Sequence, residues 1–508
     1  MLNKKNLLIA LLFIVAVGGF LRFYKLGEVS FVADEFLDMN ATYGYFKTGE
    51  WQAWDFNMGE PSQRVNVASD ERAWLYRWQV AKIFDFVAPT EANARAVSAV
   101  WGIISILVIY FVAANLTGKK MIGLMSAALF ALSVSGIEMD RHLRMYAMFF
   151  PVFLGLSWAL FRLLEGRYEQ KAVIVRKFQE KTGLNSLYIL PVTLLGVLSY
   201  HLHQLTANIV FVAGAYILIL GIMHFQKNRW NRYVIFLIGA LMAFVLAKII
   251  FPQQVASALG MLVFFEDHWS YLPIVFRDYS NAILAAMFIL AGMDYLIRKE
   301  KLAKESVWLS ASFFVPLLAA IFLWKRVVGE QYIFFIQSFE IILIASGIYG
   351  VAVFLQENMP KIGRKMFWTV IAVSFLVLPN YAYFFQENNT YRQTSRSSNP
   401  NYRSIFVYFK KNKKPTDVLV TRDFRNYYWS GQKVKTFDFG GELSKEKFNL
   451  ADFRKIMAEN PSGWFIFSDN DKDYIAEDLQ DYVEKANLEK VKAVAVKGDI
   501  SVYRWGNN

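Results

Sequence analysis

The sequence predicts an α-helical polytopic membrane protein with about eleven membrane-spanning helices, a long first outer loop and a small C-terminal α/β domain. Apolar residues make up 55% of the 508 residues and charged residues only 19%, against roughly 45–50% and about 25% in soluble domains. Long apolar runs recur along the chain, and Lys and Arg gather in alternate connections between them. This composition excludes a disordered chain and argues against a wholly soluble one.

The chain has no cysteine, which excludes disulfides, thiolate metal sites and cysteine nucleophiles. It carries 55 Lys and Arg against 42 Asp and Glu, a net charge of +13. Such an excess of basic residues favours binding to either nucleic acid or a membrane surface. The positions of these residues along the sequence distinguish the two partners.

A helix needs about 20 apolar residues to cross a bilayer core, and about 17 can suffice. Eleven runs have this length: 6–24, 96–115, 121–137, 146–164, 186–203, 204–225, 234–251, 279–297, 307–324, 331–355 and 366–386. With a cytoplasmic N-terminus, the inner connections hold nineteen Lys or Arg and the short outer ones five, as the positive-inside rule requires. The basic excess is therefore a topology signal, and it needs no nucleic-acid partner. We expect an integral plasma-membrane protein in contact with membrane lipids.

The first run, 6–24, also resembles a signal peptide. Arg22 and Lys25 follow it where a cleavage region would be small and polar, so we favour a retained anchor. The next segment is outside in either case.

Two segments are too polar to cross a membrane. Residues 25–95 form an outer loop within a transmembrane domain of residues 1–386, and 387–508 form an extracytoplasmic C-terminal domain. In this tail, strand-like runs alternate with helix-like stretches, which is typical of an α/β domain. The expected strands are 417–421, 434–438, 463–467, 490–496 and 500–505, and the expected helices are 402–412, 450–459 and 473–486.

Adjacent acids, Asp34 and Glu35, lie about ten residues past the first membrane exit. An acid at a helix N-terminus commonly caps the helix, which contributes roughly 0.5–2 kcal/mol. Capping is thus one interpretation and acid–base chemistry the other. The same pair of interpretations applies to Asp70 and Glu71, which precede Arg72 at the start of a second helical pattern.

The set of motifs resembles the GT-C superfamily of membrane glycosyltransferases, in its protein O-mannosyltransferase and aminoarabinose-transferase branch. The resemblance rests on the acids Asp34 and Glu35 in the long first outer loop, the stretch 95–102 from Arg95 to Gly102, and the stretch 140–146 with Asp140, Arg141, Arg144 and Tyr146. It covers residues 1–386 and includes the presence of a soluble tail.

The resemblance implies inverting transfer of one sugar from a polyprenyl-phosphate donor to an acceptor hydroxyl or amine at the outer face. Asp34 would be the general base that takes the acceptor proton, with Glu35 supporting it. Residues 70–76 look like the family's Glu-Lys-Pro-Pro-Leu-Tyr element, in which the acid holds a metal and the base meets the phosphate. Here Glu71 and Arg72 take those places, and Ala-Trp replaces the two prolines.

A departing phosphate needs positive charge near its oxygens. The outer cations that could supply it are Arg72, Arg141, Arg144, Lys248, Lys325 and Arg326. Arg141 and Arg144 share one face if their segment is helical. Snorkelling to lipid headgroups is the alternative for all of these except Arg72.

A divalent metal ion is an open question, with Glu71, His201 and His203 as candidate ligands. The two histidines are two residues apart and so lie on different helix faces, and a lone histidine is more often a hydrogen-bonded structural residue. Glu340, deep in the tenth run, either pairs with a buried base or lines a wet cavity. Asp70 and Tyr146 complete the expected pocket.

Two other functions compete with glycosyl transfer. A transporter or flippase of lipid-linked glycans would place charges or broken helices at the bilayer midplane, whereas most candidate groups here gather on one side. A sensor or assembly scaffold would use the tail to bind a partner. No phosphate-binding glycine loop is present, which disfavours a nucleotide-sugar donor.

Overall fold

The computed structural model describes residues 3–63, 71–166, 173–260, 262, 266–325, 327–359, 361–394, 397, 399–439, 447–485, 488–491 and 500–506. The chain divides into two compact units. The helical unit contains Met1–Phe23, Ser98–Asp140 and Met145–Tyr383, and the loop–tail unit contains Tyr24–Val97, Arg141–Arg144 and Phe384–Asn508. The first loop and the C-terminal region therefore fold together.

The helical unit consists of long helices joined by short turns. Its α-helices are α1 (Lys4–Phe23), α5 (Glu91–Thr117, whose first residues belong to the loop–tail unit), α6 (Lys120–Leu132), α7 (Val134–Asp140), α8 (Tyr146–Glu165), α9 (Val173–Thr182), α10 (Ile189–Leu202), α11 (Asn208–Phe225), α12 (Arg232–Ile250), α13 (Pro252–Leu259), α14 (Tyr271–Val275), α15 (Ala282–Asp294), α16 (Ala303–Phe322), α17 (Glu330–Ile333), α18 (Gln337–Asn358) and α19 (Gly363–Val377). Short 3-10 turns are η1 (Ser186–Tyr188), η2 (Gln204–Ala207), η3 (Phe276–Asp278), η5 (Phe334–Ile336) and η6 (Tyr381–Phe385), and η4 (Tyr295–Lys299) is a π-helix.

Seven helices of the described chain are long and apolar enough to cross a membrane, or up to nine if each of two bent pairs is one span. The structure thus gives seven to nine candidate spans by length and composition, where the sequence predicts about eleven. The run 121–137 is broken at Ser133, whose backbone is extended, so that α6 and α7 meet at 64°. The run 186–203 also belongs to a bent pair, α9 with η1–α10, at 97°.

In the two remaining runs the α-helices are shorter than predicted, although the π-helix η4 continues α15 directly from Tyr295 to Lys299. α15 has 13 residues and α19 has 15. α19 stops at Val377, because Pro379 follows and cannot continue a helix. α15 starts only after Asn281, whose side chain accepts a hydrogen bond from Leu284 N–H and so caps the helix.

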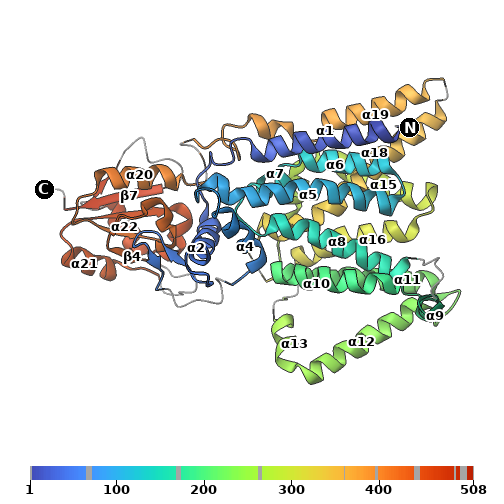
Figure 1. Ribbon diagram of the computed structural model, residues 1–508, viewed down its shortest axis with the longest axis horizontal. Helices are drawn as coiled ribbons and strands as arrows, with labels where there is room; N and C mark the ends of the chain where they lie inside the picture. The colour runs from blue at the N-terminus through green and yellow to red at the C-terminus, as the bar shows by residue number, and fades with distance from the viewer. Residues whose placement is uncertain are drawn as a thin grey trace. The chain divides into compact units, whose positions relative to one another are not determined.

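α18 is the central helix of this unit and packs on α6, α15, α16 and α19. A Cβ atom added at Gly292 of α15 would collide with the Leu343 carbonyl, and one at Gly347 of α18 would collide with the Phe288 carbonyl. Two facing glycines thus let these helix backbones touch, as in other membrane helix pairs. Figure 1 shows the long helices of the bundle running side by side.

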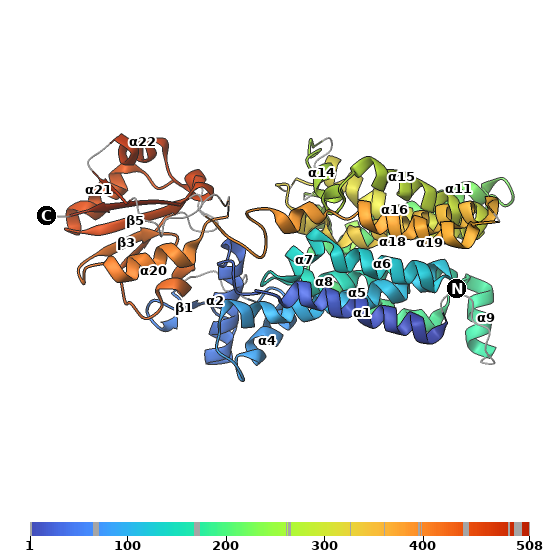
Figure 2. The same ribbon diagram turned by 90° about the horizontal axis from the view of Figure 1, so that it is seen from above.

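α12 departs from this arrangement. It packs on α11 and α13, and only 6% of its most apolar window is buried. In Figure 1 it diverges from the neighbouring bundle helices, and Figure 2 shows α9 set across their direction. An apolar helix that is exposed all round suits a lipid environment.

The loop–tail unit begins with α2 (Ala33–Thr48), the short pair β1 (Trp54–Asp55) and β2 (Glu60–Pro61), and α4 (Trp74–Ile83). Its C-terminal part contains α20 (Tyr402–Asn412), β3 (Val418–Thr421), η7 (Asp423–Trp429), β4 (Thr436–Asp438), α21 (Leu450–Glu459), β5 (Gly463–Ser468), η8 (Asp469–Tyr474), α22 (Glu477–Lys485), β6 (Glu489–Lys490) and β7 (Ile500–Trp505). The predicted α/β alternation is confirmed, except that most of the run 490–496 lies outside the described residues.

The strands form one mixed sheet in the order β4-β3-β5-β7-β6. β3 is parallel to β4 and β5, while β7 is antiparallel to β5 and β6. Leu419 lies opposite Thr436 on one side and Trp464 on the other.

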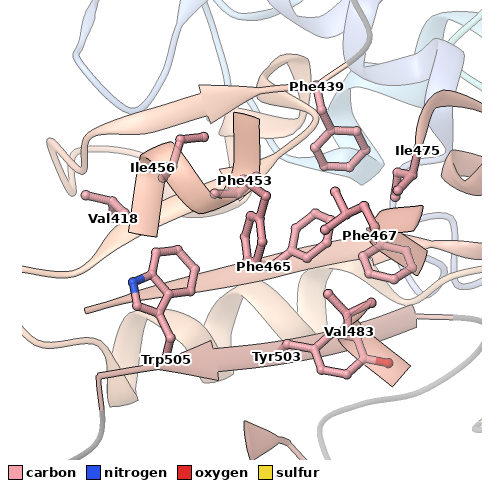
Figure 3. Packing of buried hydrophobic residues seen from close by; sticks show 12 residues of the cluster. Val418, Phe439, Phe453, Ile456, Phe465, Phe467, Ile475, Val483, Tyr503 and Trp505 are labelled. Atoms are coloured by element: carbon pink, nitrogen blue, oxygen red, sulfur yellow. The ribbon is translucent and has the colours of Figure 1, made fainter. Parts of the chain in front are cut away.

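Aromatic side chains fill the space between one face of this sheet and its helices (Figure 3). Phe465 and Phe467 of β5, Phe453 of α21 and Trp505 of β7 are at most 9% exposed. Their burial gives the sheet a core of its own.

Candidate active site

The N-terminus of α2 places the two predicted acids in opposite environments. Glu35 is fully buried, and both of its carboxylate oxygens are used. Oε1 accepts hydrogen bonds from Arg95 Nε and from the Leu143 backbone N–H, both at 2.7 Å. Oε2 accepts from Arg95 Nη2 at 2.7 Å and from the Val32 backbone N–H at 3.0 Å. Glu35 therefore caps its own helix and ties it to two other segments.

Arg95 extends this anchor into the loop that enters α2. Its guanidinium donates to the carbonyls of Leu26, Val29 and Ser30 at 3.1, 2.8 and 3.2 Å. Burial alone would raise the pKa of Glu35, but the charge and hydrogen bonds of Arg95 outweigh burial and lower that pKa below its ordinary value. Glu35 is thus held ionised as a structural carboxylate.

Asp34 lies on the surface, with its side chain 53% exposed. Its Oδ2 is 3.3 Å from Arg144 Nη2. The same guanidinium donates through Nη1 to Asp38 Oδ2 at 2.7 Å. Asp38 is almost fully buried, and its other oxygen, Oδ1, accepts from Arg77 Nε at 2.6 Å. The four side chains thus form a line in the order Asp34, Arg144, Asp38 and Arg77, and Asp34 is its solvent-exposed end.

Asp38 and Arg77 are the members of this line that sequence reasoning missed. Asp38 follows Asp34 by four residues, and this spacing places both acids on one face of α2. Arg77 belongs to α4, close to the predicted Arg72, but nothing in its local sequence distinguishes it from a surface arginine. The spacing of the two acids was the available signal.

Arg141, a predicted phosphate ligand, binds the protein itself. It is 2% exposed. Its guanidinium donates to the carbonyls of Tyr24, Lys25 and Thr390 at 2.7, 2.9 and 3.1 Å and lies 4.5 Å from the centre of the Tyr391 ring. In this position it joins the start of the first loop to the C-terminal region, and its phosphate role stays a prediction.

Glu71 and Arg72 are both exposed and lie in a turn just before α4. The next residue, Ala73, has φ +51°, a left-handed conformation that costs an alanine of order 1 kcal/mol. Backbone strain of this kind is found at functional sites. Asp70 and Arg326, also predicted site residues, lie outside the described residues.

The other predicted site residues belong to the helical unit. Lys325 is exposed, and Lys248 is also exposed, in the last turn of α12. Tyr146 is buried at the start of α8, with its hydroxyl 3.5 Å from His203 Nε2. His203 Nδ1 accepts from the Leu205 N–H and caps η2, which fits the structural interpretation of this histidine. His201 is exposed near the end of α10.

Glu340 is completely buried in α18, and neither carboxylate oxygen has a hydrogen-bond partner among the described residues. No ion pair of the described residues includes Glu340. Of the two interpretations of Glu340, pairing with a buried base is not seen among the described residues, and a wet cavity stays a prediction. Among the same residues, no group of three or more Asp, Glu or His side chains is placed to hold a metal ion, and metal dependence stays open.

Residues of the C-terminal region pack against the N-terminal end of α2 and the turn before it. The Phe31 backbone N–H donates to the Tyr428 hydroxyl at 2.7 Å, and that hydroxyl donates to Glu91 at 3.0 Å. The Phe36 ring packs edge-on against the rings of Tyr428 and Phe424. The tail thereby fixes the turn that precedes Asp34.

No protein-family model and no curated protein matches the chain. Its similarity to known proteins lies in structure. It resembles the oligosaccharyltransferase of Archaeoglobus fulgidus in the apo form, with a TM-score of 0.61, 10% identity, and coverage of 92% of this chain and 70% of that one. The same enzyme, AglB, in complex with an inhibitory peptide and a dolichol-phosphate, gives 0.59 at 9% identity, covering 91% and 69%. ArnT from Cupriavidus metallidurans bound to undecaprenyl phosphate gives 0.50 at 11% identity, covering 97% of both chains. At such identities the similarity is one of fold.

Proposed function

The chain has the GT-C fold of membrane glycosyltransferases and is an integral membrane protein, and from this premise we propose that it is an inverting glycosyltransferase. It would move a single sugar from a polyprenyl-phosphate donor to a hydroxyl or amine acceptor at the extracytoplasmic face. The donor class is supported by two relatives of the same fold, one bound to undecaprenyl phosphate and one to a dolichol-phosphate. The acceptor is a protein, a lipid or a cell-envelope glycan.

The observation that carries the proposal is the contrast between Asp34 and Glu35. A general base must reach the acceptor proton, within about 3 Å of the nucleophilic atom. Asp34 is half-exposed and held by one long contact, whereas Glu35 is buried with every oxygen used. Asp34 is therefore the base and Glu35 its structural support, which refines the catalytic pair expected from the sequence.

The reaction exchanges the sugar between two oxygen or nitrogen atoms and moves one proton to the base. The acceptor oxygen or nitrogen attacks the anomeric carbon as its proton passes to Asp34, and the bond between that carbon and the bridging phosphate oxygen breaks. The products are the inverted glycoside and a polyprenyl phosphate. Inversion places the base and the leaving phosphate on opposite sides of the anomeric carbon.

This geometry separates the candidate cations. Arg144, 3.3 Å from Asp34, lies on the side of the base, where it orients that carboxylate. A leaving phosphate needs a different partner, and we assign it to Arg72, which is exposed in the strained turn before α4. A guanidinium suits phosphate because it can donate two parallel hydrogen bonds.

The test is Asp34→Asn, with Asp85→Asn as the matched control. Asp85 belongs to the same loop, is 41% exposed and has one ion pair, with Lys82. Purified protein in lipid nanodiscs is supplied with a panel of undecaprenyl-phosphate sugars and native membranes as acceptor, and the release of undecaprenyl phosphate is measured.

We expect Asp34→Asn to lower kcat by about 10²–10⁴-fold with an unchanged melting temperature, and Asp85→Asn to behave as wild type. Unchanged release in Asp34→Asn would remove Asp34 from the chemistry. Movement of intact donor across the bilayer, with no release by the wild type, would instead favour a flippase.

A further inference from the structure

Asp38 links two arginines that come from distant parts of the chain. It lies one helical turn after Asp34 on α2, and its side chain is 2% exposed. One oxygen binds Arg77 of α4 and the other binds Arg144, at 2.6 and 2.7 Å. Arg77 and Arg144 are themselves 5% and 15% exposed, so these charges interact with little screening by water.

The lengths of the contacts rank the partners of Arg144. Its contact with Asp38 is 2.7 Å, a normal charge-assisted hydrogen bond, whereas its contact with Asp34 is 3.3 Å. The buried acid therefore takes the larger share of the guanidinium charge. The exposed acid is oriented by the same guanidinium but not enclosed by it.

Removal of the Asp38 charge would change this distribution. Arg144 would keep its charge, and the Asp34 carboxylate already lies 3.3 Å from it. A closer pair between Arg144 and Asp34 would cover the oxygen that must receive the acceptor proton. Of the two acids on this face of α2, Asp38 would hold Arg144 and Asp34 would receive the acceptor proton.

We propose that Asp38 is a positioning residue, which holds Arg144 back so that the Asp34 carboxylate stays open to the acceptor. This inference rests on the proposed function, in which Asp34 is the general base. Arg77 has a supporting task, because its bond to the other oxygen fixes the plane of the Asp38 carboxylate. No donor contact is assigned to Asp38.

Three variants test the inference in the nanodisc assay. Asp38→Asn removes the charge that holds Arg144. Asp38→Asn with Arg77→Gln removes one charge of each sign, so it leaves no extra buried charge and protects against simple unfolding. Asp38→Asn with Arg144→Gln removes the guanidinium that would cover Asp34.

The control is Asp417→Asn. Asp417 is also a buried aspartate of the loop–tail unit, 6% exposed, and accepts hydrogen bonds from Ser462 and Trp464. It lies in the C-terminal sheet region and contacts no residue of α2 among its described hydrogen bonds. Its variant reports what the loss of a buried carboxylate does to stability alone.

We expect Asp38→Asn and the charge-balanced variant to lower kcat by about 100-fold, as small misplacements of catalytic groups do, with the donor KM unchanged. The added Arg144→Gln should raise kcat above that of Asp38→Asn. If Asp38 served only to stabilise the fold, the variant with both Asp38→Asn and Arg144→Gln would have a lower kcat than Asp38→Asn alone, because it loses a second stabilising contact.

A folded charge-balanced variant with wild-type kcat, or a double variant with Arg144→Gln that is slower than Asp38→Asn, would overturn the inference. The proposed function is judged separately. If Asp34→Asn still transfers sugar, that function fails, whereas an inactive Asp34→Asn beside a fully active Asp38 variant rejects only the positioning task.

Discussion

Glu35→Gln should destabilise the loop–tail unit far more than an ordinary surface substitution. Glutamine keeps the shape of the side chain but removes its charge, and its amide nitrogen replaces one of two oxygens that accept from Arg95, Leu143 and Val32. Arg95 would keep its buried charge with only carbonyl partners. Removing one member of a buried ion pair costs about 3–5 kcal/mol.

This cost converts into a measurable shift in melting temperature. In a folded unit of 150–250 residues, 1 kcal/mol shifts the melting temperature by about 2–4 °C, so Glu35→Gln should lower it by roughly 6–20 °C. Tryptophan fluorescence of the detergent-solubilised protein during heating is a suitable assay. Glu60→Gln, at an exposed position of the same loop, is the control and should shift the melting temperature by less than about 2 °C.

The pH dependence gives an independent check. The pKa of Glu35 is lowered below 4.5 in the folded protein, so its contribution to stability is present above that value and lost as the pH falls through the folded pKa. The difference in stability between wild type and Glu35→Gln should therefore shrink below about pH 4.5. A difference that is small at pH 7, or that does not depend on pH, would refute the assignment of Glu35 as a charged structural anchor.

Two further substitutions probe the supports of the fold. Tyr428→Phe leaves the buried Phe31 N–H without its acceptor, which should cost about 1–3 kcal/mol of stability. It should also lower kcat, because this turn precedes Asp34, the proposed base. Gly102→Ala places a Cβ atom against the buried Arg22–Asp140 ion pair. This substitution should lower the free energy of unfolding by at least about 1–3 kcal/mol. Thermal unfolding measures the stability loss of both variants.

Each of these substitutions has a control. Tyr482→Phe removes the hydroxyl of a partly buried tyrosine on α22, which packs through its ring against Phe453, and Gly196→Ala on α10 adds a Cβ atom whose nearest neighbour, Leu156 Cδ1, is 3.9 Å away. Both should melt close to wild type. A Tyr428→Phe protein with wild-type kcat would show that the tail does not act on the base, and a stable Gly102→Ala would show that the helices there can move apart.

Local patterns were enough for much of the architecture. The helices at 402–412 and 450–459 were predicted to the residue, because their apolar spacing and Asn caps are properties of the local sequence. Most long apolar runs also became helices. The bend at Ser133 could not be predicted, since the apolar run continues through it and the extended backbone there depends on packing.

By itself, the sequence determined that the chain is a membrane protein, where its soluble parts lie, and that two acids stand at the start of the first loop helix. Only the tertiary structure decided which acid is exposed and which is buried. Successive residues on a helix point about 100° apart, so Glu35 faces Arg95, sixty residues away, while Asp34 faces outward. The charged line that ends at Asp34 consists of Asp38, Arg77 and Arg144, and folding brings Arg77 and Arg144 to α2 from distant parts of the chain.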